Sequence, residues 1–295
     1  MKKILLLSAF LLCNIVISQT TQQAGDWDDP DTWGGTVPSN TANIVIAHSI
    51  DVDDTRVCNS ITINSGARLD VEASLTVATT SVNNGLLYIY NGGTLTQTAG
   101  NFTNSNDLQI KKGGIMVFSD AGTTLTNTGN LQILSSNSLF GSLLLSGTYS
   151  ESGSGTIFYR RYVAGTDYWD LIGTPLSSNT IFDFIEDNED IATNGSSPTV
   201  YALGIYNNTS ESAGNGNGGW TNYTSSNIVS SGNLISGRGY QMATSGTSTG
   251  SEITFNGTLL TSSVARTLTT NEEGSSSPSD GTKFELIANP YASYV

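Results

Sequence analysis

Cysteine, histidine and basic residues are scarce in this sequence. Cys13, Cys58 and His48 are the only residues of the first two types among 295, and 11 Lys and Arg stand against 25 Asp and Glu. These side chains are too few to fill the tetrahedral shell of zinc, and no third group positions Cys58 and His48 as nucleophile and base. The formal net charge of −14 would repel phosphate backbones and anionic lipid surfaces, so we expect no nucleic-acid or membrane-surface partner.

Charged residues of either sign make up only 12% of the chain. Asn, Ser, Thr and Gly supply most of the polarity, and they alternate with Leu, Ile, Val and Tyr at the two-residue period of strands. A disordered acidic chain would lack these interleaved apolar residues. The composition therefore predicts an ordered all-β protein.

Residues 1–18 have the pattern of a secretory signal peptide. Lys2 and Lys3 precede a short apolar run, and compact residues at its end predict cleavage after Ser18. The run is too short to span a membrane, so we expect no membrane span after signal removal. Removal would leave Cys58 as the only cysteine, which excludes a disulfide within the chain. We expect a secreted protein or one on the outer cell surface.

Three copies of one motif follow one another in the first half. They are NNGLLYIYNGGTL from Asn83, NSNDLQIKKGGIM from Asn104 and NTGNLQILSSNSL from Asn127, whose first residues are 21 and 23 positions apart. A period of about 20 residues, with short alternating strands and Gly or Asn corners, indicates a β-solenoid whose coils stack. Equivalent asparagines are then expected to hydrogen-bond along a ladder. A β-sandwich with evenly spaced hairpins is the alternative.

The fold that we predict is all-β, a right-handed parallel β-helix (solenoid) followed by a β-sandwich-like domain. Residues 19–59 are expected to form an N-terminal cap, because Trp27 and Trp33 could cover the unpaired edges at an open solenoid end. Residues 60–157 would form rungs of about 21 to 23 residues, as repeats of this period do. Residues 158–295 would form the second domain.

The sequence ends on a second copy of one of its own motifs. WDLIGTPLSS, from Trp169, and FELIANPYAS, from Phe284, share an aromatic residue, Leu-Ile and a Pro-stopped turn. This pattern is typical of a core strand leaving a sheet. Because the second copy has no closing strand after it, we expect the second domain to be incomplete and the chain to be a fragment of a longer protein.

Two stretches resemble known bacterial families. The segment with Trp27, Trp33 and Pro38 is similar to the opening of G8-type solenoid modules of bacterial surface proteins. Residues 158–295 resemble a segment of large secreted proteins of the Bacteroidetes, in which the stretches YWDLIGTPL, GRGYQM, ITFNGTLL and FELIANPYAS follow in this order. The resemblance implies a flavobacterial, adhesin-like surface protein exported by the type IX pathway.

Four aspartates near the N-terminus form a candidate calcium site. Asp26, Asp28, Asp29 and Asp31 crowd within DWDDPD, and carboxylate oxygens are the ligands that Ca²⁺ prefers. The alternative is a solvated Asp-rich turn, since the Asp-x-Asp-x-Asp-Gly calcium loop is missing. Calcium is the one cofactor that the sequence suggests.

Trp220 and Tyr223 form a candidate carbohydrate site. They lie in GNGNGGWTNYTSSN, and an exposed Trp flanked by amides could stack on a sugar ring. The alternative is that Trp220 caps the core of the second domain, because large aromatic side chains are usually buried.

No catalytic residue is predicted. Polysaccharide cleavage needs cations or paired carboxylates on one face, but residues 60–157 hold only Arg68, Lys111 and Lys112 as basic residues, and their carboxylates do not recur at rung spacing. The expected function is that of a non-catalytic secreted or cell-surface structural or adhesion protein, which meets cell-surface components or extracellular polysaccharide. A polysaccharide-binding or polysaccharide-degrading β-helix protein is the alternative.

Overall fold

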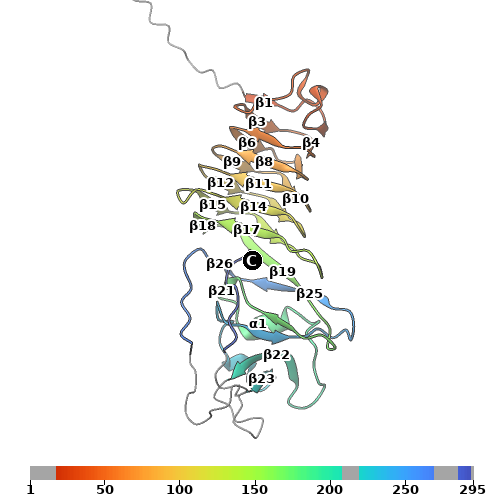
Figure 1. The fold of residues 1–295 in the computed structure, drawn as a ribbon, viewed down its shortest axis with the longest axis vertical. Helices are drawn as coiled ribbons and strands as arrows, with labels where there is room; N and C mark the ends of the chain where they lie inside the picture. Colours follow the sequence, from red (N-terminus) through yellow and green to blue (C-terminus); the bar gives the residue numbers. More distant parts are fainter. Residues whose placement is uncertain (1–17, 208–218, 269–284, 294–295) are drawn as a thin grey trace, which may run out of the picture.

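The computed structural model describes residues 18–207, 219–268 and 285–293. The predicted signal peptide, apart from Ser18, lies outside the described residues. The chain forms a parallel β-solenoid of about six turns, followed by antiparallel sheets, which confirms the predicted fold class. Figure 1 shows the solenoid as a long stack with the antiparallel part at the end away from its first coil.

Each full turn of the solenoid contributes one strand to each of three sheets, here called A, B and C. Sheet A consists of β1 (Ser18–Thr20), β3 (Asn43–Ile46), β6 (Ser60–Ile63), β9 (Ser81–Asn83), β12 (Phe102–Asn104), β15 (Thr124–Asn127) and β18 (Thr148–Glu151). Sheet B consists of β2 (Gly25–Asp26), β4 (Ser49–Val52), β7 (Arg68–Val71), β10 (Leu86–Ile89), β13 (Asp107–Ile110), β16 (Asn130–Ile133), β19 (Thr156–Val163) and β25 (Ser251–Asn256). Sheet C consists of β5 (Arg56–Cys58), β8 (Ser74–Val77), β11 (Thr94–Gln97), β14 (Ile115–Phe118) and β17 (Ser142–Leu145).

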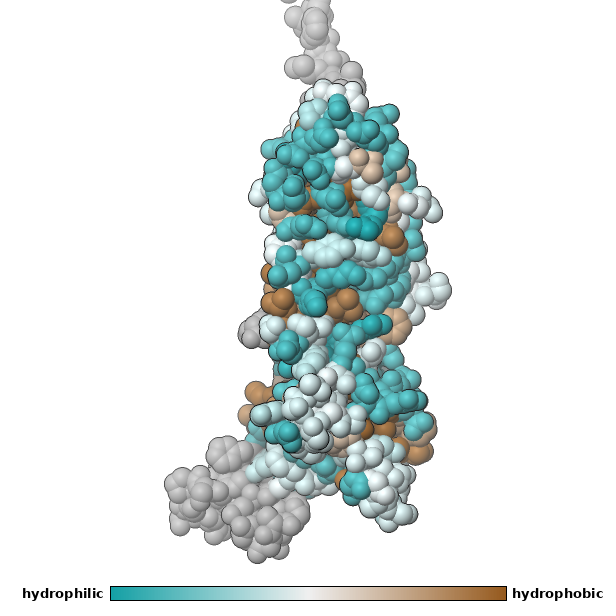
Figure 2. Space-filling view, turned by 90° about the vertical axis from the view of Figure 1, so that its right-hand side faces the viewer, coloured by the Kyte–Doolittle hydropathy of each residue, from teal (hydrophilic) through white to brown (hydrophobic). Residues whose placement is uncertain are grey.

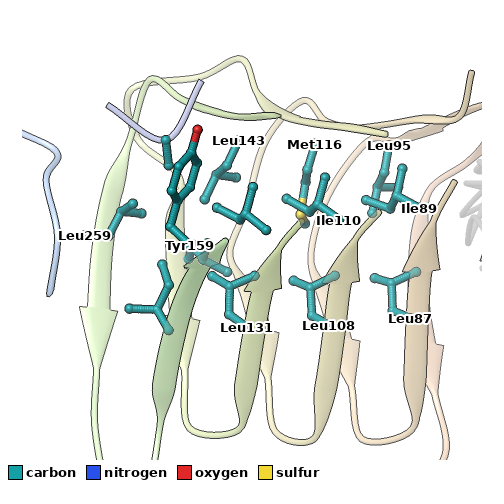
Figure 3. Close-up of a cluster of buried hydrophobic side chains, with 14 of the residues drawn as sticks. Leu87, Ile89, Leu95, Leu108, Ile110, Met116, Leu131, Leu143, Tyr159 and Leu259 are labelled. Carbon is teal, nitrogen blue, oxygen red and sulfur yellow. The ribbon is translucent and has the colours of Figure 1, made fainter. Parts of the chain in front are cut away.

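Inward-facing side chains stack in columns along the solenoid. Leu87, Leu108 and Leu131 are paired in register on β10, β13 and β16, and all three are buried. Figure 3 shows this column on one wall of the core, with Met116 and Leu143 from sheet C among the side chains opposite. Full burial of one such leucine stabilises the fold by about 1.5–3 kcal/mol. Because alternate residues of a strand point to the same face, apolar residues at alternate positions all point into the core and stack in columns from coil to coil.

A ladder of asparagines runs through the same interior. Asn83 Nδ2 donates to Asn104 Oδ1, and Asn104 Nδ2 donates to Asn127 Oδ1, both at 2.8 Å. The three side chains are fully buried at one register position of sheet A. Each amide also reaches the backbone of a following strand, as Asn104 Nδ2 does with Asn130 O at 3.0 Å. The predicted ladder is therefore confirmed.

Pairs of glycines serve the corners after β10 and β13 for two different reasons. Gly92 and Gly113 have φ angles of 87° and 81°, which side chains rarely adopt. Gly93 and Gly114 follow them, and a Cβ at Gly114 would collide with the backbone carbonyl of Ile89 in the preceding coil. The first glycine permits the turn and the second permits the close stacking.

A tryptophan pair closes the first coil. Trp27 and Trp33 are buried, their rings meet edge to face at a centroid distance of 5.1 Å, and Trp33 Nε1 donates to Trp27 O at 2.7 Å. Trp33 ends the 3₁₀ helix η1 (Pro30–Trp33). The segment expected as a cap, residues 19–59, also supplies strands to all three sheets, so it is continuous with the stack.

Sheet B joins the solenoid to the antiparallel part. β19 pairs in parallel with β16 and antiparallel with β25, so the expected boundary between residues 157 and 158 falls inside one strand. Behind this junction, the ring of Phe255 stacks on Phe184 at 4.8 Å and lies 6.1 Å from that of Tyr159. One hydrophobic core therefore runs from the first coil into the antiparallel part.

The antiparallel part contains a four-stranded sheet, a two-stranded sheet and short helices. In spatial order the four strands are β20 (Asp170–Ile172), β24 (Tyr240–Met242), β22 (Val200–Asn207) and β23 (Gly219–Thr224). The other elements are β21 (Leu176–Ser177), β26 (Thr258–Leu259), α1 (Ile181–Glu186) and the 3₁₀ helix η2 (Ile228–Ser230). Among the helices of the described residues, none has the length and apolarity needed to cross a bilayer.

The two copies of the repeated motif meet along one segment of the chain. In the first copy, Ile172 pairs with Tyr240 of β24. In the second copy, Leu286 O accepts from Gly239 N at 2.9 Å, and Ala288 N donates to Gly237 O at 3.0 Å. The two copies thus pair with successive parts of residues 237–242. The motif is repeated because one copy pairs with β24 and the other, a similar extended segment, pairs with the residues just before β24.

Candidate functional site

Trp220 and Tyr223 lie on opposite faces of β23. Trp220 is 41% exposed, and its ring meets that of Tyr206 edge to face at 5.3 Å. Tyr223 is partly buried against the core, and burial raises its pKa to about 12. Because side chains three positions apart on a strand point to opposite faces, the two cannot form one platform. The alternative expectation, that Trp220 caps the core of the second domain, is therefore wrong.

The face that carries Trp220 is here called the open face of the four-stranded sheet. The core-facing residues of its strands, Ile172, Tyr240, Met242 and Leu203, are all buried. On the open face, Leu171, Gln241, Gly204 and Asn222 stand in one row across β20, β24, β22 and β23. Leu171 is 56% exposed, so this end of the row lies outside the hydrophobic core.

An amide pair crosses the middle of the open face. Gln241 Nε2 donates to Asn222 Oδ1 at 2.6 Å, although β22 lies between the two strands. Gly204 makes this contact possible, because a Cβ at that position would collide with Asn222 Oδ1. The glycine leaves room for the Asn222 side chain, and the hydrogen bond orients the two amides.

A small cleft adjoins this amide pair. Its volume is about 170 Å³, and Trp169, Tyr201, Asn194 and Asn222 are among its lining residues. The described residues that line it are all uncharged. Trp169 is 43% exposed here. The cleft therefore offers aromatic surface beside amide and hydroxyl groups, a composition suited to an uncharged, hydroxylated ligand.

Trp169 was missed by sequence reasoning. The aromatic-Leu-Ile motif was interpreted as a core strand, which is correct for Ile172 but wrong for Trp169 and Leu171, since both are exposed. Alternation along the strand was the available signal: Trp169 and Leu171 fall on one face, Asp170 and Ile172 on the other. Only the strand order shows that this face lies open beside Asn222.

The four candidate calcium ligands lie in the N-terminal coil. Asp26 ends β2, and Asp29 Oδ1 caps η1 by accepting the Asp31 backbone N–H at 2.9 Å. Asp28 Oδ2 lies 3.7 Å from Arg56 Nη2. Within the described part of the chain, no group of three or more His, Cys, Asp or Glu side chains is arranged to hold a metal ion. Calcium binding by these residues stays a prediction.

His48 and Cys58 have local packing roles. His48 Nδ1 lies 3.1 Å from Thr21 Oγ1, beside the first coil. Cys58 is fully buried at the end of β5, and this burial raises the pKa of its thiol to about 12. The thiol therefore stays protonated at neutral pH, which disfavours a nucleophilic role.

The outward face of sheet B brings together carboxylates that are distant in sequence. Asp26, Asp51 and Asp70 occupy one register position on β2, β4 and β7. Arg68 Nε donates to both oxygens of Asp70 at 2.9 Å, and the Asp70 side chain is only 3% exposed. Burial first, and then the charges of Asp70 and Glu72, raise the pKa of Asp51. Arg68 compensates one buried carboxylate but leaves Asp51 under repulsion.

An aromatic side chain on the same face is held between two cations. The Tyr88 ring centroid lies 4.3 Å from Lys111 Nζ and 5.8 Å from Arg68 Cζ. Lys111 donates in turn to Gln109 Oε1, and burial lowers its pKa. Figure 2 shows that mostly hydrophilic residues cover this side of the stack. Cations from the rungs before and after β10 thus contact one aromatic ring.

Comparison with protein-family models, with curated proteins and with solved structures gave no match for the chain.

Proposed function

We propose that this chain is a non-catalytic secreted or cell-surface protein of the structural or adhesion class. In this proposal the solenoid is a rigid spacer, and the antiparallel part at its end meets the partner. The observation that supports it best is the single hydrophobic core, which runs through the coils and across the β19–β25 junction. A spacer needs such continuity, because a separate core in each part would allow hinge motion.

The outward face of sheet B supports the non-catalytic part of the proposal. Asp70 accepts from Arg68 Nε, whose one N–H is shared by both carboxylate oxygens, and the Lys111 ammonium donates to Gln109. A general base or a charge-stabilising cation must instead be able to reach the reacting atoms of a substrate. These ionic side chains are therefore already bonded to residues two positions away in the chain.

Labelling of intact cells tests this function. Antibodies raised against the purified chain should stain the producing cells without permeabilisation, and the purified chain should release no reducing or unsaturated sugar from polysaccharides. Staining that requires permeabilisation would contradict the surface location. Sugar release by the purified chain would contradict the non-catalytic role.

Polysaccharide binding is a second candidate function, and the exposed Trp220 favours it. A tryptophan at 41% exposure contributes less to the core than its size allows, whereas its apolar ring is available to a ligand. Binding of the chain to a polysaccharide panel, measured with and without Trp220→Ala, tests this candidate. Unchanged binding in the variant would remove Trp220 from it.

A further inference from the structure

We propose that the open face binds an uncharged polysaccharide chain that lies across Trp169 and Trp220, with Asn222 and Gln241 bonding its hydroxyls between them. This inference rests on the second candidate function above. It adds a second aromatic platform, replaces Tyr223 by an amide pair and names the ligand class.

The two tryptophans are the aromatic platforms of the site. They are 43% and 41% exposed, and both flank Asn222: Trp220 is two positions before it on β23, and Trp169 shares its cleft. Exposed indole rings cost stability in water unless a ligand covers them. An apolar sugar face can stack on such a ring while its hydroxyls stay available for hydrogen bonds.

The amide pair supplies the polar contacts between the platforms. The bond from Gln241 Nε2 to Asn222 Oδ1 fixes the direction of Asn222 Nδ2, a donor, and of Gln241 Oε1, an acceptor. Sugar hydroxyls both donate and accept, so they can satisfy both atoms at once. Preorganised groups of this kind lose little side-chain entropy on binding.

The charge of the site selects the ligand class. The described residues that line the cleft carry no charge, and the whole chain has a formal net charge of −14. A carboxylated or sulfated polysaccharide would be repelled by the chain and would meet no cation in the cleft. A neutral polysaccharide is not repelled by the protein and needs no cation in the cleft.

Retardation of the chain in native gels that contain one polysaccharide each tests the proposal. The gels would contain neutral β-linked glucan, neutral xylan, polygalacturonate or alginate. A neutral polysaccharide should retard the chain, and Trp169→Ala and Trp220→Ala should each weaken binding by about tenfold or more, as loss of an aromatic anchor does. The control is Tyr168→Ala, because Tyr168 is 66% exposed beside Trp169 but does not line the cleft.

The outcomes separate the two hypotheses. Retardation by neutral polysaccharide that only Trp220→Ala weakens would overturn the two-platform site while leaving polysaccharide binding by Trp220 intact. No retardation of the wild type, or retardation by the anionic polysaccharides alone, would overturn the proposal and leave the surface role to the cell-labelling test. Should Trp169→Ala fail to fold, as judged by its thermal transition, Gln241→Ala takes its place, and unchanged binding in that variant overturns the proposal.

Discussion

At the residue scale, Asn104 shows how a polar side chain can be buried inside an apolar stack. Its amide donates to Asn127 and to a backbone carbonyl, and it accepts from Asn83. A buried polar group is tolerated only when its partners are present, and the stack supplies the same partner at each rung. The repeat thus allows an asparagine to be buried with its hydrogen bonds satisfied at the same position of successive coils.

Removal of one member of the ladder should be costly. Asn104→Ala leaves the amides of Asn83 and Asn127 each without one partner, so we expect a loss of about 1–3 kcal/mol in the free energy of unfolding. Urea denaturation measures this loss. Asn106→Ala, at an exposed turn of the same coil, is the control and should change the value by less than about 0.5 kcal/mol. Equal losses in both variants would show that the ladder does not stabilise the solenoid.

Asp51 should make stability depend on pH. Its pKa is raised above the ordinary value of 3.8, mainly by burial and then by Asp70, so ionisation costs the folded state more than the unfolded state. The folded chain therefore loses stability as the pH rises from about 4 through the raised pKa of this group.

Replacement by an uncharged isostere tests this cause. Asp51→Asn should raise the thermal midpoint at pH 7, and the difference from the wild type should shrink as the pH falls below about 4. Asp53→Asn, at an exposed position two residues further, is the matched control. A gain that is independent of pH, or an equal gain in the control, would contradict the assigned cause.

At the element scale, the corners of the rungs limit which residues can follow a sheet B strand. Gly114 lies so close to the preceding coil that a methyl group at this position would meet the Ile89 carbonyl oxygen. Gly114→Ala should therefore push two coils apart and cost about 1–3 kcal/mol of unfolding free energy. Chemical denaturation of the full chain measures the effect.

The matched control is Gly122→Ala, where the nearest contact of a new Cβ would be the flexible Asp120 side chain. It should cost less than about 1 kcal/mol, since that side chain can move away. If Gly122→Ala were as damaging as Gly114→Ala, close coil stacking would not be the reason for the second glycine.

Sequence reasoning predicted the solenoid well because the patterns that define this fold lie within neighbouring stretches of the chain. The spacing of Asn83, Asn104 and Asn127 gave the period, the alternation gave the inward columns, and both are confirmed. Each coil pairs with the next one along the chain, so the repeat in the sequence is also the order in space.

The open face could not be predicted in the same way. Its strands pair in the order β20, β24, β22 and β23, so Trp169 and Asn222 are brought together from sites far apart in the chain. The short helix α1 was also missed, because six residues with Phe182 exposed and Phe184 buried show too little periodicity. Asp51 and Asp70 likewise become neighbours only through the register of β4 and β7.

At the scale of the whole molecule, the proposed spacer role requires that the solenoid and the antiparallel part move as one body. β25 extends sheet B beyond β19, and Leu143 of the last sheet C strand donates its backbone N–H to Ala292 O at 2.7 Å. Figure 1 shows this end of the described chain at the junction, near β17 and β26. Contacts on both sides of the junction should therefore hold the open face at a fixed distance from the first coils.

A distance measurement between two spin labels tests this central claim most directly. Ser65→Cys in the second coil and Val229→Cys in η2 provide exposed thiols in a chain that starts at Gln19 and so lacks Cys13. The buried Cys58 thiol, with a pKa of about 12, should stay unlabelled, and treating the same chain without the two substitutions with the label checks this. Pulsed electron spin resonance should give one narrow distance distribution for the rigid body that we describe. A broad or two-peaked distribution would show a hinge between the two parts and would contradict the role of the solenoid as a rigid spacer.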